Sequence, residues 1–343
     1  MDTREPLIKG MDLQITKVGI VVHDAVRTAK LYSRLYGLGP WTFHDIEPSL
    51  AVFQGKPGDG ATCGVRLAVA ELGDKKVDLV QPLYGSSCPM AHLWERGEGI
   101  HHLSLNLPDG YDALLEMLKR EGVRVETEGE VSGQGRFVQF GSWQSLGVLF
   151  EVWEPGAGLP EPWGRLEAPG RGAVETAGKR IAQIGIVTED AEGMARRYWE
   201  LFGIGPWLLF EWRPPVGEAK VLHGVPVQPG VETVIRAAIA DHPNLQIELL
   251  EPVTGPSTHM EYLRTHGPGP HHLSFDIVED HDETVEALGA EGIVVEMQGL
   301  AGPAYQYTYM ATQRQLATVW ELVKFFPEED VDAGMYGTYP QSE

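Results

Sequence analysis

Four polar side chains in the second half of the chain interrupt strands that are otherwise apolar: Gln183, Glu248, His272 and Glu321. A lone glutamate in a strand usually faces solvent, because antiparallel sheets often have one wet face. If buried, a carboxylate needs a partner charge or a metal. Two carboxylates, an imidazole and an amide oxygen together form a ligand set that a divalent cation accepts. The oxygen donors suit Mn, Mg or Co and the imidazole suits Zn, Ni or Fe, so the set predicts a metal site of open metal identity.

The elements that must position these side chains occur twice. The strand predicted at Ile15 to Val22 has a counterpart at Ile181 to Thr188, and the His-His strand predicted at Ile100 to Leu107 has one at His271 to Val278. The separation between counterparts changes by only a few residues over the length of a domain. Such self-similarity indicates a tandem duplication.

Each copy follows the same predicted order of elements. A β-branched strand is followed by a helix, with Asp24 or Asp190 where an N-cap belongs and Gly37 or Gly203 where the helical pattern ends. Strands of alternating apolar residues come next, then the His-His strand, a second amphipathic helix and closing strands. The order strand–helix–three strands is therefore predicted twice in each copy.

The predicted domain organisation follows from the repeat. We expect a first domain at 11–155, a linker at 156–179 that is dense in proline and glycine, a second domain at 180–326 and an acidic tail at 327–343. A chain of 343 residues is long enough for two domains that each bury a core.

Composition limits the classes of partner. The net charge of −22 argues against a nucleic-acid backbone or an anionic membrane surface. Met1 to Gly10 lacks the apolar run of a signal peptide and no stretch is long enough to span a membrane, so we expect a cytoplasmic protein. The two cysteines, Cys63 and Cys88, are expected to be reduced thiols, with a disulfide or a reactive nucleophile as the alternatives.

The repeated modules, the "x-x-V/I-G-I" opening strand, the His-His strand and the closing strand with a central glutamate resemble the vicinal oxygen chelate superfamily. That family includes glyoxalase I, methylmalonyl-CoA epimerase, extradiol dioxygenases and antibiotic-resistance proteins. The resemblance covers residues 11 to 325. It implies an α+β fold of four βαβββ modules, paired into two glyoxalase-like domains with curved mixed sheets.

The resemblance also implies which residues hold the metal. The four ligand positions of the family fall on Gln183, Glu248, His272 and Glu321. This set resembles the site of eukaryotic-type glyoxalase I, whereas epimerases more often have His first and Gln second. Extradiol dioxygenases have His first, so Gln183 departs from their pattern and counts against activation of O₂ at ferrous iron.

The first copy has Lys17, Asp78, His102 and Glu151 at the same four positions. A protonated lysine has donors and no acceptor, so it is not a normal metal ligand. Its ammonium could instead pair with Asp78 and Glu151 and take the place of the metal. The first copy is then structural or a separate binding pocket; the alternative is an active site in which Lys17 acts as acid and base.

Further candidates concern the substrate. Arg236 matches Arg66 of the first copy; a strand arginine is usually solvated or salt-bridged, but in this fold it can face the pocket and clamp a carboxylate or phosphate. Tyr309 could supply a phenol from one face of its strand, while a packing role is favoured for Tyr307. Trp207 is a candidate for contact with an aromatic ligand, together with Trp41 and Trp212. By strand alternation His101 and His271 point to the opposite face from their neighbours and are expected to be packing or surface residues.

Three functions remain open at this point. The first is a divalent-metal enzyme (Zn, Ni, Co, Mn or Fe) that removes a proton α to a carbonyl of a small organic substrate, with Glu321 or Glu248 moving the proton. Its outcome would be epimerisation, isomerisation or a lyase step. The alternatives are a ring-cleaving extradiol-type dioxygenase and a metal-free small-molecule binding or resistance protein. A homodimer is compatible with each of the three.

Overall fold

The computed structural model describes residues 14–58, 60, 62–107, 110–174, 179–275 and 278–340. Our expectations for Met1 to Gly10, for the domain start at residue 11 and for the last three residues of the tail lie outside these residues. The chain folds into two compact units. The N-terminal unit contains the described residues 14–174 and the segment 315–317, and the C-terminal unit contains 179–314 and 318–340.

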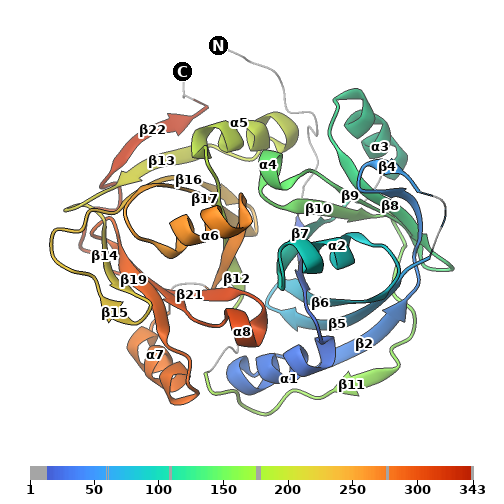
Figure 1. Ribbon diagram of the computed structural model, residues 1–343, viewed down its shortest axis with the longest axis horizontal. Helices are drawn as coiled ribbons and strands as arrows, with labels where there is room; N and C mark the ends of the chain where they lie inside the picture. Colours follow the sequence, from blue (N-terminus) through green and yellow to red (C-terminus); the bar gives the residue numbers. More distant parts are fainter. Residues whose placement is uncertain are drawn as a thin grey trace. The chain divides into compact units, whose positions relative to one another are not determined.

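The N-terminal unit is built on one mixed sheet with helices on its surfaces (Figure 1). Its strands are β1 (Ile15–Val21), β2 (Trp41–Ile46), β3 (Ser49–Phe53), β4 (Lys56–Pro57), β5 (Gly64–Leu72), β6 (Lys75–Tyr84), β7 (Gly99–Leu105), β8 (Val125–Val131), β9 (Gly135–Phe140), β10 (Leu149–Trp153) and β11 (Gly164–Leu166). Its helices are α1 (Ala25–Tyr36), α2 (Cys88–Glu95), α3 (Tyr111–Arg120) and α4 (Trp143–Leu146).

The second part of the chain repeats this arrangement. Its strands are β12 (Ile181–Val187), β13 (Trp207–Trp212), β14 (Glu218–Leu222), β15 (Val225–Pro226), β16 (Val234–His242), β17 (Leu245–Thr254), β18 (Gly269–Phe275), β19 (Val295–Ala301), β20 (Tyr305–Met310), β21 (Val319–Phe325) and β22 (Met335–Tyr339). Its helices are α5 (Ala191–Phe202), α6 (Thr258–His266), α7 (His281–Ala290) and α8 (Gln313–Leu316).

The strand order reveals two βαβββ modules in each unit. In the N-terminal sheet the order β2-β5-β6-β1 is followed by β7-β10-β9-β8, and in the C-terminal sheet β13-β16-β17-β12 is followed by β18-β21-β20-β19. The first and last strands of a module pair in parallel, and the first strands of the two modules pair antiparallel at the centre. The predicted α+β fold of four modules in two curved mixed sheets is confirmed.

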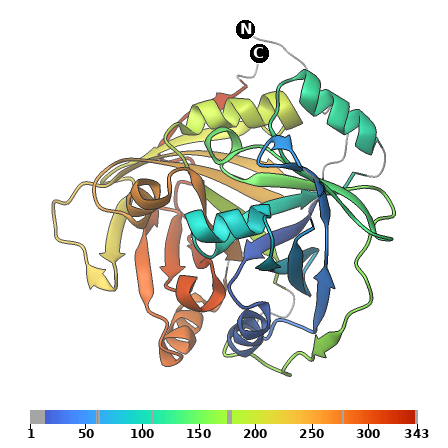
Figure 2. The same cartoon turned by 45° about the vertical axis from the view of Figure 1, so that its right-hand side comes forward.

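Each sheet curls around an interior, and one short helix lies within the curl: α2 in the N-terminal unit and α6 in the C-terminal unit (Figure 1; Figure 2). The helix α1 packs on β5 and β6 from outside, and α5 packs on β16 and β17 in the same way. Residues of both modules of a unit line the pocket on the concave face of its sheet.

The helix signals in the sequence correspond to real caps. The Asp24 carboxylate accepts from the Arg27 backbone N–H at 2.9 Å, and Asp190 accepts from the Gly193 N–H at 2.8 Å. Both helices end on a glycine in the left-handed region, Gly37 with φ 63° and Gly203 with φ 69°, which a residue with a Cβ adopts less easily. The repeated sequence thus folds into repeated local structure.

Two segments outside the predicted domains also contain strands. β11, in the predicted linker, pairs with β2, and β22, in the predicted acidic tail, pairs with β13. Among the described residues, no helix has the length and apolar character needed to cross a membrane.

Candidate metal centre of the C-terminal unit

The register of four central strands brings three candidate ligands onto the concave face of the C-terminal sheet. Gly185 on β12 pairs with Glu248 of β17 on one side and with His272 of β18 on the other. Glu321 of β21 pairs with Ser274, two residues beyond His272 on the same strand. Because side chains alternate along a strand, Glu248, His272 and Glu321 point to one face.

The glycine of the opening strand makes room for the histidine. A Cβ on Gly185 would overlap the His272 imidazole ring, and a Cβ on Gly19 would overlap the His102 ring in the other unit. The ring therefore lies across the neighbouring strand, where only a glycine leaves space for it. This accounts for the glycine in the "V/I-G-I" strand of both copies.

His272 stands between the two carboxylates. Its Nε2 atom is 3.5 Å from Glu248 Oε2 and 3.4 Å from Glu321 Oε2, and the exposed fractions of the three residues are 0%, 7% and 4%. Neither His272 Nε2 nor Glu321 Oε2 has a hydrogen-bond partner. Buried polar atoms are almost always bonded, so two unsatisfied atoms directed at each other indicate a missing partner.

The spacing of these atoms fits a divalent cation. Two ligand atoms about 2.1 Å from one metal ion at a tetrahedral angle lie about 3.4 Å apart. Two buried carboxylates next to one imidazole also need a compensating positive charge. The donor set, one nitrogen and two carboxylate oxygens, is one that such a cation accepts. The residues present therefore fit a bound divalent metal.

The pKa shifts of His272 and Glu248 also favour a positive charge at this site. Burial lowers the pKa of His272, but the charges of Glu321 and Glu248 outweigh burial and raise this pKa to about 9. Burial raises the pKa of Glu248, and the charge of Glu321 adds to the effect. The two carboxylates thus stabilise a positive charge at the imidazole nitrogen between them.

A second imidazole orients the first. His271 Nδ1 lies 3.2 Å from His272 Nδ1, and both rings are buried. Burial lowers the pKa of His271 well below its ordinary value, so this ring is neutral at pH 7. A hydrogen bond between the two Nδ1 atoms leaves His272 Nε2 free to accept a metal, as supporting partners of ligating histidines commonly do. The prediction that His271 is a packing residue missed this contact.

A third histidine completes a buried cluster. Nitrogens of His259, His271 and His272 all lie within 4.8 Å of one another. We assign the candidate metal site to His272 and the two carboxylates, because the carboxylates need a compensating positive charge, whereas His259 and His271 are neutral rings that need none. His259 Nε2 is 3.1 Å from the Tyr309 hydroxyl, and burial lowers the pKa of His259 to about 3. His259 and His271 are therefore neutral rings that support His272 from behind.

A pocket of about 440 Å³ opens over the carboxylates. Its lining includes Glu248, Glu321, His259 and the apolar side chains Trp212, Ile235, Leu250 and Leu300. Tyr307 and Tyr309 also line it. Burial raises the pKa of both phenols, and the charges of Glu321 and Glu248 raise it further, so both remain protonated donors. Tyr307 thus faces the pocket, whereas the sequence favoured packing.

Gln183 lies beside this group on β12. It pairs with Gln246 in the register that also aligns Gly185 with Glu248, so the two glutamines and Glu248 share the concave face. Its amide nitrogen donates to Gln246 Oε1 at 2.6 Å. No contact between Gln183 and the other three candidate ligands is present among the described residues.

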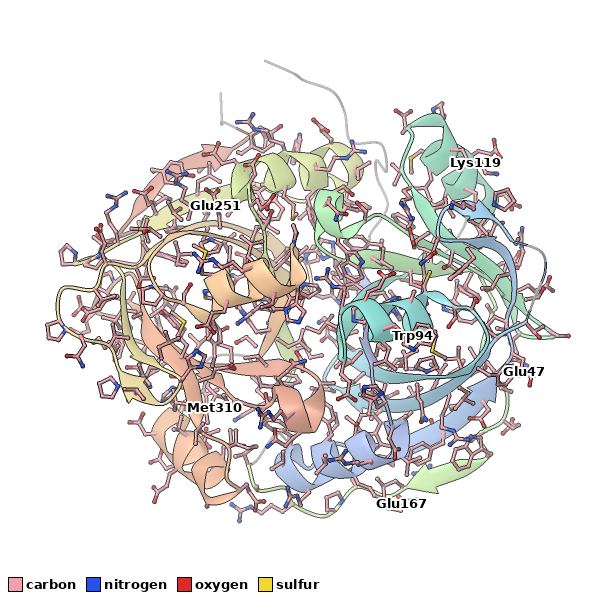
Figure 3. The ribbon with its side chains drawn as sticks, viewed as in Figure 1. Glu47, Trp94, Lys119, Glu167, Glu251 and Met310 are labelled. Carbon is pink, nitrogen blue, oxygen red and sulfur yellow. The ribbon has the colours of Figure 1, made fainter. Side chains whose placement is uncertain are left out.

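The structure does not bring Arg236 to the pocket. Its guanidinium donates to Glu211 at 3.0 Å and to Glu251 at 3.1 Å, and it is part-exposed. Glu251, labelled near α5 in Figure 3, also accepts from the N–H of Ala191 at the start of that helix. Because α5 packs on the outside of β16 and β17, this cluster lies on the outer face of the sheet. The neighbouring residue of β16, Ile235, points to the opposite face of the sheet and lines the pocket.

Trp207 is also not a pocket residue. It is fully buried, its indole N–H donates to the Ile204 carbonyl at 2.6 Å, and its ring packs against Tyr198. Trp41 makes the matching bond to Leu38 in the N-terminal unit. Of the three tryptophans considered, only Trp212 lines the pocket. The tryptophan that follows Gly-Pro in each copy therefore packs in the hydrophobic core of its unit.

The N-terminal unit presents the same positions with a different chemistry. Lys17 Nζ lies 3.7 Å from Asp78 Oδ2, and burial lowers the pKa of Lys17 while the charges of Asp78 and Glu151 raise it overall. His102 Nε2 lies 3.5 Å from Glu151 Oε2. A lysine ammonium therefore supplies the positive charge in this unit, as the sequence suggested.

The Glu151 carboxylate is fully engaged. It accepts from the Ser104 hydroxyl at 2.8 Å, the Gln139 amide at 3.0 Å and the Trp153 indole at 2.8 Å. Its counterpart Glu321 has Tyr309 opposite it in place of Gln139, and the Tyr309 hydroxyl bonds to His259 instead. At this strand position, therefore, Glu321 has an unsatisfied carboxylate oxygen and Glu151 has none.

Comparison with known proteins places these features in a family. The model of the "Glyoxalase/Bleomycin resistance protein/Dioxygenase superfamily" matches residues 16–140 and again 182–309. None of the curated protein sequences compared with the chain matches it.

Solved structures resemble the chain to different degrees. A triple mutant of 4-hydroxymandelate synthase from Streptomyces coelicolor matches with a TM-score of 0.60 at 15% identity, over 91% of this chain and 92% of that chain. The Mn(II)-bound glyoxalase from Novosphingobium aromaticivorans has a TM-score of 0.46 at 16% identity, over 94% and 87%. Methylmalonyl-CoA epimerase from Mycobacterium tuberculosis has a TM-score of 0.31 at 21% identity, over 43% and 89%. At 15% identity, the likeness to the 4-hydroxymandelate synthase concerns the fold alone.

Proposed function

The chain belongs to the glyoxalase, bleomycin resistance protein and dioxygenase superfamily, and from this premise we propose that its C-terminal unit is a divalent-metal-dependent enzyme. In this proposal the enzyme removes a proton α to a carbonyl of a small organic substrate. The single observation that carries it is His272 between two buried carboxylates, with His272 Nε2 and Glu321 Oε2 lacking partners. Zn, Ni, Co, Mn and Fe all suit this donor set.

Glu248, His272 and Glu321 would hold the cation, with Gln183 as the fourth proposed ligand. When bound, the cation would act as a Lewis acid on the carbonyl oxygen of the substrate. The chain's own residues do the rest. Glu321 would move the proton, because this residue lines the pocket and its Oε2 atom accepts no hydrogen bond.

Other residues would orient the substrate and exclude water. The phenols of Tyr307 and Tyr309 stay protonated and line the pocket, so they can donate to a substrate oxygen. Ile235, Leu250 and Leu300 provide an apolar wall. A dry pocket strengthens each electrostatic interaction in it. Epimerisation, isomerisation and a lyase step all begin with this proton transfer.

Metal content tests the site first. We expect about one divalent ion per chain in protein loaded with Mn²⁺ or Zn²⁺ and then desalted, measured by plasma mass spectrometry. His272→Ala and Glu321→Gln should lose this ion, whereas His102→Ala, the matched variant of the N-terminal unit, should retain it. Full metal retention in both C-terminal variants would contradict the assignment.

Solvent-deuterium exchange tests the chemistry. Incubation in D₂O with a panel of α-keto acids and acyl thioesters should place deuterium at the α-carbon of at least one compound, detected by NMR. The rate should fall at least a hundredfold in Glu321→Gln. Oxygen consumption with a catechol, in place of exchange, would favour the dioxygenase alternative.

A further inference from the structure

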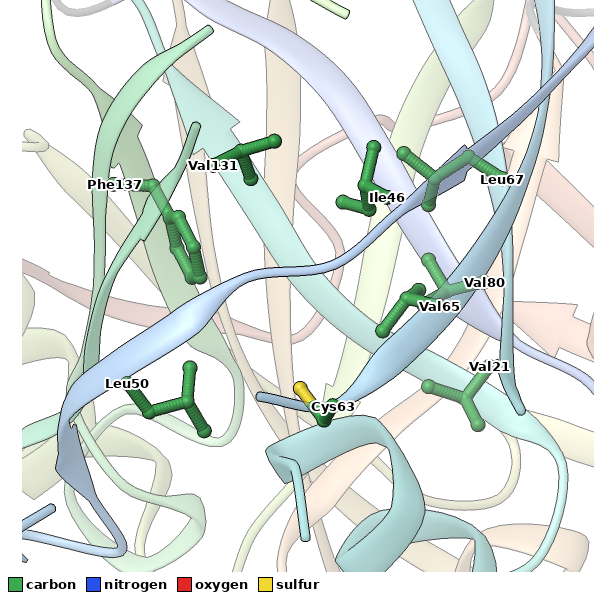
Figure 4. Packing of buried hydrophobic residues seen from close by; sticks show 9 residues of the cluster. All are labelled: Val21, Ile46, Leu50, Cys63, Val65, Leu67, Val80, Val131 and Phe137. Carbon is green, nitrogen blue, oxygen red and sulfur yellow. The ribbon is translucent and has the colours of Figure 1, made fainter. Parts of the chain in front are cut away.

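The N-terminal unit contains a cavity that the proposed reaction does not use. The space between its lining side chains, including the solvent at its mouth, measures about 610 Å³. Apolar side chains form its walls, among them Ile46, Leu67, Val80 and Phe137. Figure 4 shows Leu50 and Phe137 on one side of this cluster and Ile46, Leu67 and Val80 on the other.

One end of the cavity is polar, and one of the residues that line it has an unsatisfied atom. Lys17 and Asp78 both line it, with the ammonium 3.7 Å from Asp78 Oδ2. The other oxygen, Asp78 Oδ1, is buried and has no hydrogen-bond partner, and Asp78 is only 4% exposed. A buried acceptor without a donor costs free energy, so a molecule that brings a donor to Oδ1 is favoured.

The charges at this end select an uncharged group. Glu151 is engaged by Ser104, Gln139 and Trp153, so it offers little to a ligand. The opposite charges of Lys17 and Asp78 compensate each other. An ammonium has three donors, and one faces Asp78, so Lys17 can donate to a ligand while Asp78 Oδ1 accepts from it. A hydroxyl group, which both donates and accepts, fits this pair.

The walls favour an aromatic body. Phe137 stacks on Trp153 with ring centroids 5.1 Å apart, and both residues line the cavity. A third ring can extend this arrangement, since offset aromatic pairs contribute beyond their buried area. A carboxylate in the same place would face Asp78, and an amine would face Lys17.

We propose that the N-terminal unit is a second ligand site that binds, without a metal, an uncharged aromatic alcohol or phenol. The hydroxyl of the ligand donates to Asp78 Oδ1 and accepts from Lys17, and its ring occupies the space between Phe137, Leu67 and Val80. The inference uses no atom of the C-terminal unit and is independent of the function proposed above.

Calorimetric titration of the full chain with 1-naphthol in the presence of EDTA tests this site. We expect binding to wild type, weaker binding of 1-naphthoate and 1-naphthylmethylamine, and at least tenfold weaker binding of 1-naphthol to the double variant Lys17→Met/Asp78→Leu. This variant removes both charges together and leaves neither unpaired; its unfolding temperature checks that it folds. Leu67→Trp should fill the cavity and abolish binding, while His272→Ala should leave the affinity unchanged.

Protection of the two cysteines from alkylation tests where the ligand binds in the wild-type protein. Cys63 and Cys88, the two cysteines of the sequence, both line this cavity as free thiols. Bound 1-naphthol should therefore slow their alkylation by N-ethylmaleimide at least threefold, measured by mass spectrometry. Absence of binding, unchanged alkylation at a saturating concentration, tighter binding of a charged analogue, or loss of binding in His272→Ala would each overturn the proposal.

Discussion

The two carboxylates Glu151 and Glu321 occupy equivalent strand positions and differ in what surrounds them. Glu151 accepts hydrogen bonds from Ser104, Gln139 and Trp153. Glu321 keeps one oxygen without a partner, at 3.4 Å from His272. A carboxylate whose hydrogen bonds are satisfied is stabilised little by a cation, whereas a buried carboxylate with an unsatisfied oxygen is stabilised strongly. Single residues around the glutamate therefore separate a charge-paired site from a candidate metal site.

Replacing Gln183 by lysine, the residue at the equivalent position of the N-terminal unit, should convert the candidate metal site into a charge-paired site. In Gln183→Lys we expect the new ammonium to pair with Glu248, as Lys17 pairs with Asp78, and to displace the cation. Metal content measured by plasma mass spectrometry should fall at least tenfold, with little change in unfolding temperature in EDTA. Gln183→Met, which cannot pair with a carboxylate, is the control and should lose less metal.

Acid should weaken the N-terminal unit through Glu151. Burial raises the pKa of this carboxyl, but the charges of His102 and Lys17 and two hydrogen bonds lower it from 4.5 to about 2. A lowered pKa stabilises the fold above pH 4.5, and this contribution is lost as the pH falls from 4.5 toward 2. In Glu151→Gln the free energy of unfolding at pH 7 should therefore drop by about 3 kcal/mol.

Urea unfolding at pH 7 and at pH 3 provides the measurement. The difference between wild type and Glu151→Gln should be smaller at pH 3. Glu130→Gln changes an exposed glutamate of β8 and should behave as wild type at both values. A difference that stays constant with pH would contradict the assigned role of Glu151.

At the scale of elements, the opening strand of each unit is shaped around a histidine. β12 runs between β17 and β18, and its Gly185 lies under the His272 ring. The pairing of β12 with β18 places the His272 ring beside Gly185, and a hydrogen bond with His271 orients the ring. Three elements thus fix one ligand, which favours a preorganised site.

Gly185→Ala should therefore damage the metal site specifically. The added methyl group must displace the imidazole, so we expect metal affinity to fall about 10- to 100-fold. The overpacking should cost about 1–3 kcal/mol of stability. Gly19→Ala creates the same overlap with His102 and is the matched control. It should lose similar stability and leave metal affinity, measured by competition with a chromogenic chelator, unchanged.

At the scale of the whole molecule, duplication allows the two units to diverge. Both sheets have the same strand order, and both concave faces carry a pocket. One unit pairs Asp78 with Lys17, while the other has Gln183 at the lysine position and an unsatisfied oxygen on Glu321. One chain can thus present two different sites on one repeated scaffold.

Metal should consequently stabilise the chain through the C-terminal unit. A ligand at a free concentration of one hundred times its Kd adds about 2.7 kcal/mol to the native state. Differential scanning calorimetry with and without MnCl₂ should show an upward shift in unfolding temperature that is lost in His272→Ala. If His102→Ala shows the same metal-dependent shift as wild type, the shift comes from the C-terminal site. Loss of the shift in His102→Ala would contradict the assignment.

The sequence by itself determined the duplication, the α+β modules, their capped helices and the family. These follow from local signals: strand alternation, helix periodicity, caps such as Asp190, and the repeat itself. The same signals singled out Glu248, His272 and Glu321, because a polar residue inside an apolar strand stands out without any structure.

Only the tertiary structure decided what those residues contact. A shift of one residue in strand register turns every side chain to the other face, and no local signal fixes it. Arg236 therefore lies with Glu211 and Glu251 on the outer face, and Trp207 lies in the core. The unsatisfied atoms of the metal centre and of Asp78 depend on partners from distant strands. Hydrogen bonds between such strands form only when the chain is folded, so the chemistry of each pocket is a tertiary property.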